Sequence, residues 1–162
     1  MPAPAILERA AGFNPHGFGF CTPQKTYKTL SFEAFMKNIR KVHESEPCII
    51  HFRYATTGSV RRANCHPFKA GDIRFAHNGV LHIETKNDMT DSETFFKNNV
   101  MPVVNKYGFG SAMLQTFMAG HAGYSKFAMM KNDKISLYGN FEQLDGCYYS
   151  NLRFLNYYYI NH

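Results

Sequence analysis

Apolar residues near the start of the chain recur at spacings typical first of a helix, then of strands, then of a helix again. Residues 3–12 and the stretch after Ser31 repeat apolar side chains at intervals of three and four, which predicts two helices, the second capped by Ser31. Between them, residues 17–22 and 26–30 have strand-like alternation on either side of a Pro-Gln turn. This arrangement predicts a β-hairpin.

The most apolar strand candidate is the run at residues 48–54, in which strand formers follow one another almost without interruption. Such a run suits a strand covered on both faces, and we expect it to lie centrally in a sheet. A polar and basic loop follows at residues 58–63. A second strand is predicted at residues 73–77, directly before Asn78-Gly79.

The second half of the chain begins with a helix signal and ends with a hairpin signal. Thr90 followed by Glu93 is a capping-box pattern, and the apolar helical positions after it continue past Pro102, a possible kink. A further helix is predicted at residues 111–119, and strands at 126–130 and 135–138 are joined across an Asn-Asp turn. Strands, then helices, then strands indicate an α+β or layered α/β fold rather than a repeating βαβ fold. Because no linker or repeat divides the sequence, we expect one domain over residues 1–162.

Composition narrows the class of protein. The chain has 162 residues, 44% of them hydrophobic and 15% aromatic, as in a folded globular protein. Its formal net charge of +6 is scattered, so nucleic-acid binding is not expected. Four cysteines without a pairing pattern, and no signal peptide, favour a cytoplasmic protein with reduced thiols. The apolar runs are too short to predict a membrane span.

Three polar segments could carry chemistry, although each has a structural interpretation when taken alone. Arg53 at the end of a buried strand could be an ion-pair partner in the core. The Asn78-Gly79 dipeptide could form a type I′ hairpin turn. Asp91 could interact with the positive end of the helix that it begins.

Together and in this order, the segments resemble the glutamine-binding half of class II glutamine amidotransferases. The family pattern runs H-x-R-x-A-T, N-x-H-P, H-N-G and D-[ST]-E, and it is matched here at residues 51–56, 64–67, 77–79 and 91–93. Residues 14–19 also resemble the family's N-P-D-G-x-G segment, with His16 where an aspartate is usual. The resemblance covers roughly residues 12 to 150.

The resemblance implies a fold and a glutamine site. The fold is the four-layer αββα sandwich of N-terminal-nucleophile hydrolases, shortened here at its first strand. Arg53 would bind the glutamine carboxylate and Asp91 its ammonium. The Asn78 amide and the Gly79 N–H would form an oxyanion hole. Further substrate-binding residues implied by the resemblance are Thr56, Thr57 and His77.

The family's activity is hydrolysis of glutamine to glutamate and ammonia, with the ammonia passed to a synthase domain or partner. No cofactor or metal is implied. A zinc site built from Cys48, His51, Cys65 and His66 is not favoured, because strand geometry puts the first two on opposite faces.

The nucleophile that the resemblance calls for is missing. In the family it is a cysteine that follows the initiator methionine and uses its own α-amine as base. This chain begins Met1-Pro2, and no strand precedes the helix at residues 3–12. Cys65 beside His66 is the best substitute on paper, but neighbours on an extended segment point in opposite directions.

Two interpretations of the missing cysteine stay open. Either the chain is truncated and belongs to a longer, active glutaminase, which we favour, or it is a catalytically dead module that keeps the fold for binding or structure. The tail at residues 152–162, with three consecutive tyrosines at 157–159, lies outside the resemblance. An edge strand or a partner-binding surface are the two interpretations of that tail.

Overall fold

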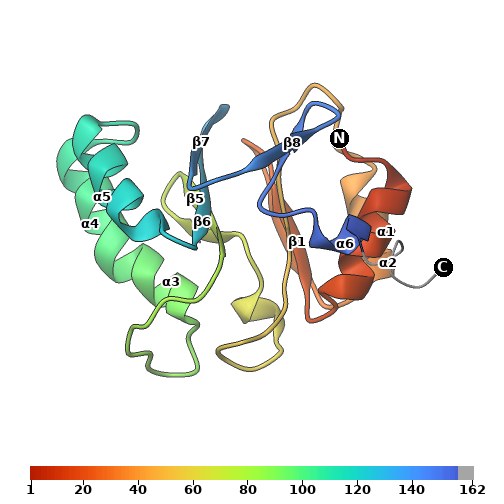
Figure 1. Cartoon of the computed structure of the whole chain (residues 1–162), viewed down its shortest axis with the longest axis horizontal. Coiled ribbons are helices and arrows are strands. Elements are labelled where there is room, and N and C mark those ends of the chain that lie inside the picture. Colours follow the sequence, from red (N-terminus) through yellow and green to blue (C-terminus); the bar gives the residue numbers. More distant parts are fainter. Residues whose placement is uncertain (157–162) are drawn as a thin grey trace.

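The computed structural model describes residues 1–156, so the predicted role of the three tyrosines at 157–159 lies outside the described part. Helices and strands alternate along the chain (Figure 1). In order, the elements are α1 (Pro4–Phe13), β1 (Phe18–Cys21), β2 (Thr26–Thr29), α2 (Phe32–Ile39), β3 (Ile49–Phe52), η1 (Arg62–Asn64), β4 (Phe68–Ala70), β5 (Ile73–Asn78), α3 (Asp91–Phe95), η2 (Phe96–Val100), α4 (Met101–Tyr107), α5 (Ala112–Ala122), β6 (Lys126–Lys131), β7 (Lys134–Tyr138), β8 (Glu142–Leu144), β9 (Cys147–Tyr149) and α6 (Arg153–Asn156).

The described strands form three antiparallel sheets, so the α+β character expected from the sequence is present. One sheet has the order β2-β1-β3, the second has the order β4-β5-β6-β7, and β8 pairs with β9 in a third. Helices α3, α4 and α5 cover the outer face of the four-stranded sheet, and α1 and α2 lie on the far side of the three-stranded sheet (Figure 1). The two larger sheets therefore face each other between layers of helices.

Three apolar clusters hold these layers together. The largest packs stacked aromatic rings such as Phe75 and Phe96, whose centroids are 4.9 Å apart, between the four-stranded sheet and its helices. A second cluster surrounds Phe35 between the three-stranded sheet and helices α1 and α2. A smaller third cluster, which includes Cys21 and Met130, lies between the two sheets. Because that third cluster is small, room remains between the sheets for a cavity.

Local sequence signals predicted the first half well. The hairpin of β1 and β2 forms, and the Ser31 hydroxyl accepts from the Ala34 N–H as the cap of α2. The expected central position of the strand at 48–54 is wrong, because β3 lies at the edge of its sheet within the described residues. Its apolar run reflects burial on both faces, which does not require a strand on both sides.

In the second half, Thr90 caps α3 by accepting from the Glu93 N–H, as the capping box predicts. The helix widens into the π-helical segment η2 just before Pro102, which stands in the first turn of α4. The short strands β4, β8 and β9 were not predicted, since three-residue strands carry little periodic signal. No helix among residues 1–156 is long and apolar enough to cross a membrane.

Candidate functional site

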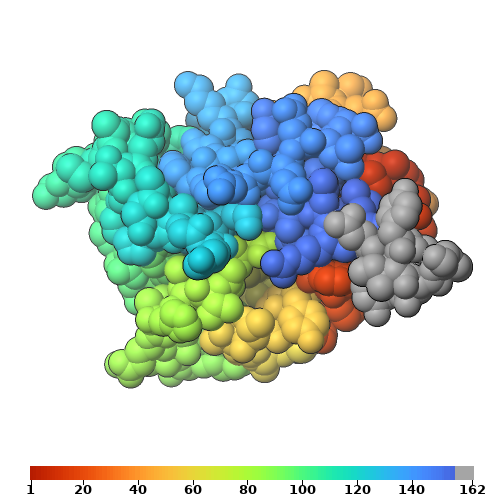
Figure 2. Space-filling model, viewed as in Figure 1, coloured from red at the N-terminus to blue at the C-terminus, as the bar shows by residue number. Residues whose placement is uncertain are grey.

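A cavity of about 890 Å³ opens between the two larger sheets, near the ends of β3 and β5. The third, two-stranded sheet and α6 close one side of it, and in the space-filling view this C-terminal segment covers the seam between the two halves (Figure 2). All seven residues singled out from the sequence line the cavity: Arg53, Thr56, Thr57, His77, Asn78, Gly79 and Asp91. They come from β5, α3 and the loops that follow β3 and β5.

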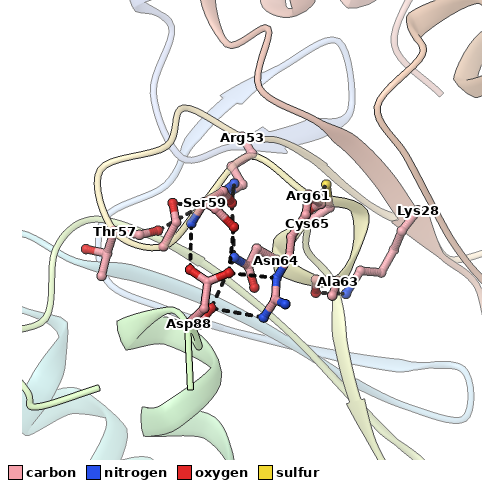
Figure 3. A network of polar contacts seen from close by, with 10 residues as sticks. Lys28, Arg53, Thr57, Ser59, Arg61, Ala63, Asn64, Cys65 and Asp88 are labelled. Carbon is pink, nitrogen blue, oxygen red and sulfur yellow. Dashed lines mark hydrogen bonds and ion pairs between the residues drawn. The ribbon is translucent and has the colours of Figure 1, made fainter. Parts of the chain in front are cut away.

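Arg53 follows β3 directly and is 3% exposed. Its Nη1 donates to the Ser59 carbonyl at 3.0 Å, and its Nη2 donates to the carbonyls of Thr57 at 2.7 Å and Gly58 at 3.2 Å. A guanidinium has five N–H donors, so three of them organise the loop at residues 57–59 and two remain. The Arg53 side chain thus holds the loop at residues 57–59 in place (Figure 3), and both Arg53 and Thr57 line the cavity.

Asp91 begins α3 and is 5% exposed. Its Oδ1 accepts from the Ser92 backbone N–H at 2.7 Å and from the Ser92 hydroxyl at 3.2 Å, and its Oδ2 accepts from the Leu81 N–H at 2.8 Å. These neutral donors fix the carboxylate without neutralising its charge. Asp91 is therefore a preoriented anion at the cavity wall, and its lone pairs exceed the donors that the protein supplies.

Asn78 and Gly79 end β5 at the cavity. The Asn78 Nδ2 donates to the Ser150 hydroxyl at 2.7 Å, which leaves its second amide hydrogen for another acceptor. Gly79 has φ +144°, and a Cβ on it would lie 2.5 Å from Ser125 Oγ and 2.9 Å from His77 Nε2. Only glycine fits there, because Ser125 and His77 already occupy the space that a side chain would need.

His77 is held by two serines behind this dipeptide. Its Nδ1 lies 2.8 Å from Ser92 Oγ and its Nε2 lies 3.0 Å from Ser125 Oγ, and the ring stacks on Phe127. Burial lowers the pKa of His77 to about 4, although the charge of Asp91 acts in the opposite direction. A neutral ring that donates from Nδ1 to Ser92 and accepts at Nε2 from Ser125 satisfies all of these contacts. His77 therefore connects Ser92, which donates to Asp91, with Ser125, which lies against Gly79.

Two further histidines lie at the cavity wall and were not singled out as site residues. The rings of His51 and His66 have centroids 4.1 Å apart. His51 Nε2 lies 3.0 Å from the His77 carbonyl, whereas neither ring nitrogen of His66 has a hydrogen-bond partner among the described residues. Burial lowers the pKa of His51 to about 4 and that of His66 well below its usual value. Both rings are consequently neutral near pH 7.

Burial disfavours the thiolate form of three of the four cysteines, Cys21, Cys48 and Cys65. Cys65 is fully buried outside the cavity lining, with its Sγ 3.6 Å from the carbonyl oxygen of Arg61, and burial raises its pKa. Burial also raises the pKa of Cys21 and Cys48 to about 12. All four thiols are free. Within residues 1–156, no group of three or more His, Cys, Asp or Glu side chains is arranged to hold a metal ion.

Sequence reasoning missed the serines that orient the predicted residues. Ser125 contacts His77 from 48 positions away, and Ser150 contacts Asn78 from 72 positions away. Nothing in the local sequence around either serine marks it as a partner. Ser92 could have been found, because it lies inside the capping box next to Asp91.

More than half of the sequence matches a known family. Residues 21–118 match the family described as glutamine amidotransferases class-II. The chain belongs to this family. The resemblance indicated by the short motifs is thereby confirmed, and the matched region contains all seven of the predicted site residues that line the cavity.

A curated relative of this class II amidotransferase supports the same assignment. The mouse protein named amidophosphoribosyltransferase is 46% identical over 48 residues, which is 27% of this chain and 9% of that protein. The chain therefore aligns with only a small part of this relative. The name amidophosphoribosyltransferase describes the reaction of the mouse protein.

Proposed function

We propose that this chain is the glutaminase part of an amidotransferase: it binds glutamine in the cavity between the sheets and hydrolyses the side-chain amide when a nucleophilic cysteine is supplied. The observation that carries the proposal is the convergence of Arg53, Asp91 and Asn78-Gly79 on one cavity from separate elements. The Arg53 cation, the Asp91 anion and the donors of Asn78-Gly79 match the carboxylate, ammonium and carboxamide of glutamine. Thr56 and Thr57 add polar groups at the same rim.

Recognition of the amino-acid end rests on the two charges. The glutamine ammonium is attracted by the preoriented Asp91 carboxylate, which has lone pairs to spare. The glutamine carboxylate pairs with Arg53, either through its two remaining donors or by displacing a loop carbonyl. In a buried site, charge-assisted hydrogen bonds of this kind are stronger than neutral ones. His77 has a supporting role, because both of its ring nitrogens already form hydrogen bonds with serine hydroxyls.

Amide hydrolysis requires stabilisation of the oxyanion that forms when a thiolate attacks the carboxamide. The second amide hydrogen of Asn78 and the backbone N–H of Gly79 are the proposed donors. Collapse of the tetrahedral intermediate releases ammonia and leaves a thioester, which water hydrolyses to glutamate. Ammonia would then pass to a synthase partner or domain, as is general for the family.

We place the strand that would carry the nucleophile along β3, at the wall of the cavity. The backbone N–H and C=O of Arg53 both bond toward β1, so strand alternation turns those of Ile50 and Phe52 toward the opposite edge of β3, along which no strand of residues 1–156 pairs. That edge lines the cavity. We assign the helix-sheet-sheet-helix layering to the N-terminal-nucleophile hydrolase fold on this basis, with an added strand along β3 bringing its cysteine toward Asn78-Gly79.

The second candidate is a binding module without catalysis. It is favoured by the cysteines, because burial raises the pKa of Cys21, Cys48 and Cys65, and Cys65 lies outside the cavity lining. In that case the pocket binds an amino acid but does not hydrolyse its side-chain amide.

The deciding experiment compares glutamate and ammonia release by the 162-residue chain with release by a version extended by a strand that begins Met-Cys. Turnover in the extended version, lost when its cysteine is replaced by serine, supports the glutaminase. Glutamine binding without turnover in either version supports the binding module. Turnover by the 162-residue chain that disappears in Cys65→Ala would contradict both, because it would place the nucleophile at Cys65.

A further inference from the structure

The loop that Arg53 organises is fastened to a distant segment by one aspartate. Asp88 Oδ1 accepts from the Ser59 N–H at 3.0 Å, and its Oδ2 accepts from the Ser59 hydroxyl at 2.6 Å. The same Oδ2 lies 3.1 Å from Arg61 Nε in an ion pair. Figure 3 shows these contacts converging on the Asp88 carboxylate from the loop above it.

The backbone of Asp88 joins in the same contacts. Its carbonyl accepts from Arg61 Nη2 at 3.1 Å and from the buried Asn64 Nδ2 at 3.2 Å. Asn64 Nδ2 also donates to the Ser59 carbonyl at 3.0 Å, which is the carbonyl that receives Arg53 Nη1. Ser59 therefore connects Asp88 to Arg53. Its N–H and hydroxyl donate to the Asp88 carboxylate, and its carbonyl accepts from the Arg53 guanidinium.

The two segments joined by Asp88 carry the two charges of the proposed glutamine site. The loop at 57–64 follows β3 in one sheet and surrounds Arg53. Asp88 lies three positions before Asp91, which begins α3 beside the other sheet. In the space-filling view the loop coloured golden and the segment coloured lime green lie side by side at the lower rim (Figure 2). Arg53 and Asp91 belong to different layers of the fold, and Asp88 with its partners joins the segments that carry them.

We propose that Asp88 is a positioning residue that sets the spacing between Arg53 and Asp91 and thereby the selectivity for an L-α-amino acid. The inference rests on the proposed function, since it specifies how that site recognises its ligand. The ammonium and carboxylate of an α-amino acid have the same separation in both enantiomers, so two charges alone cannot distinguish them. When Arg53 and Asp91 are held at one spacing they fix the α-carbon, and Asn78-Gly79, the proposed site of the carboxamide, then supplies the third contact, which only one enantiomer reaches in that pose.

The position itself is suited to this role. Asp88 has φ +56°, a left-handed conformation that aspartate and asparagine tolerate better than most residues. Asp88→Asn therefore keeps the backbone and one acceptor oxygen while it removes the ion pair with Arg61. Asp72→Asn is the matched control, because Asp72 forms a 3.4 Å surface ion pair with Lys131 at the edge of the four-stranded sheet and does not line the cavity.

The test combines three measurements on the 162-residue chain and its variants: the thermal midpoint, hydrogen exchange of residues 55–64, and the affinities for L- and D-glutamine by calorimetry. In Asp88→Asn we expect faster exchange in the loop, about five- to tenfold weaker binding of L-glutamine and a smaller ratio of L to D affinity. Ser59→Ala should change the same quantities in the same direction but less, since its backbone N–H remains. Asp72→Asn should leave all three unchanged.

A purely structural role for Asp88 would shift the thermal midpoint and weaken both enantiomers equally, and that result overturns the inference. Unchanged loop exchange, or faster exchange with unchanged affinities, overturns it as well. If the wild-type chain binds neither enantiomer while the loop still responds to Asp88→Asn, then the glutamine proposal fails and the positioning role fails with it, but the fastening of the loop by Asp88 stands. Loop exchange thus separates the two kinds of failure.

Discussion

The Asn78 carboxamide donates a 2.7 Å hydrogen bond to the hydroxyl of Ser150 and so joins the end of β5 to the segment after β9. An amide anchored through one hydrogen has its second hydrogen aimed in a fixed direction. Oxyanion stabilisation depends on such fixed donors, because they need no reorganisation during the reaction. Ser150 therefore belongs to the proposed oxyanion hole by its effect on Asn78.

Replacement of Ser150 should affect the reaction more than binding. In a version that carries the nucleophile, we expect Ser150→Ala to lower kcat by about tenfold with little change in KM, since the Asn78 donor acts on the oxyanion. Ser150→Thr keeps a hydroxyl and is the control. A rise in KM alone would show that Ser150 shapes the pocket without aiming Asn78.

Replacement of either charged residue should weaken glutamine binding. Arg53→Lys cannot reproduce the planar guanidinium and Asp91→Asn removes the anion, so each should cost about 2 to 5 kcal/mol of binding free energy. Arg74→Lys is a matched control, because Arg74 is equally buried but bonds to the carbonyls of Asp72 and Pro23 away from the cavity. Equal calorimetric titrations for wild type and both site variants would show that the cavity does not recognise an amino acid.

A side chain at position 79 should destabilise the fold. Gly79→Ala places a Cβ against Ser125 and His77 at a positive φ, and we expect a loss of about 1 to 3 kcal/mol in the free energy of unfolding. Gly12→Ala is the control: Gly12 lies inside α1, and a Cβ at this position would have nothing within 4 Å, so alanine there should stabilise slightly. Urea unfolding measures both. Equal stabilities would mean that the segment after β5 shifts freely.

Stability should fall as the pH is lowered from about 6.5 toward 4. His51 and His77 have pKa values of about 4 in the folded chain against 6.5 when unfolded, so the unfolded chain binds more protons in this window. Their contribution is fully present above pH 6.5 and is lost as the pH falls to 4, by up to about 3 kcal/mol for each residue. Urea unfolding at a series of pH values measures the slope.

His66→Phe isolates part of this dependence. His66 packs between His51 and Phe68 without a hydrogen bond from either ring nitrogen among the described residues, so phenylalanine preserves the ring contacts and removes one titrating group. The slope of stability against pH should become shallower. An unchanged slope would show that His66 titrates in the folded chain as it does in the unfolded one.

Local sequence signals predicted most of the helices and longer strands, but they did not predict contacts between residues far apart in the sequence. The caps at Ser31 and Thr90 were predictable because the cap and its partner lie three residues apart. The edge position of β3 was not, because an apolar run records burial and carries no information about neighbouring strands. The hydroxyl of Ser125 is equally invisible in the sequence, since its partner lies 48 residues earlier.

The candidate site was found through several weak motifs in a fixed order. Arg53 alone, or Asn78-Gly79 alone, fits an ordinary structural role, and the structure does give Arg53 one, since three of its donors hold a loop. The capacity of Asp88 to fasten that loop to the segment before α3 depends on side-chain geometry that no spacing rule describes.

The Ser150 contact also bears on how the chain acquires its site during synthesis. The cavity walls include residues from Ile6 to Phe154, and Asn78 meets its partner only after β8 and β9 have emerged. Contacts of such sequence separation form late, because the intervening chain must first be ordered. A ribosome-bound chain that ends near residue 118 would contain the four motifs matched at residues 51–93 yet lack one wall of the pocket. Completion of the pocket thus requires synthesis to continue at least to Phe154.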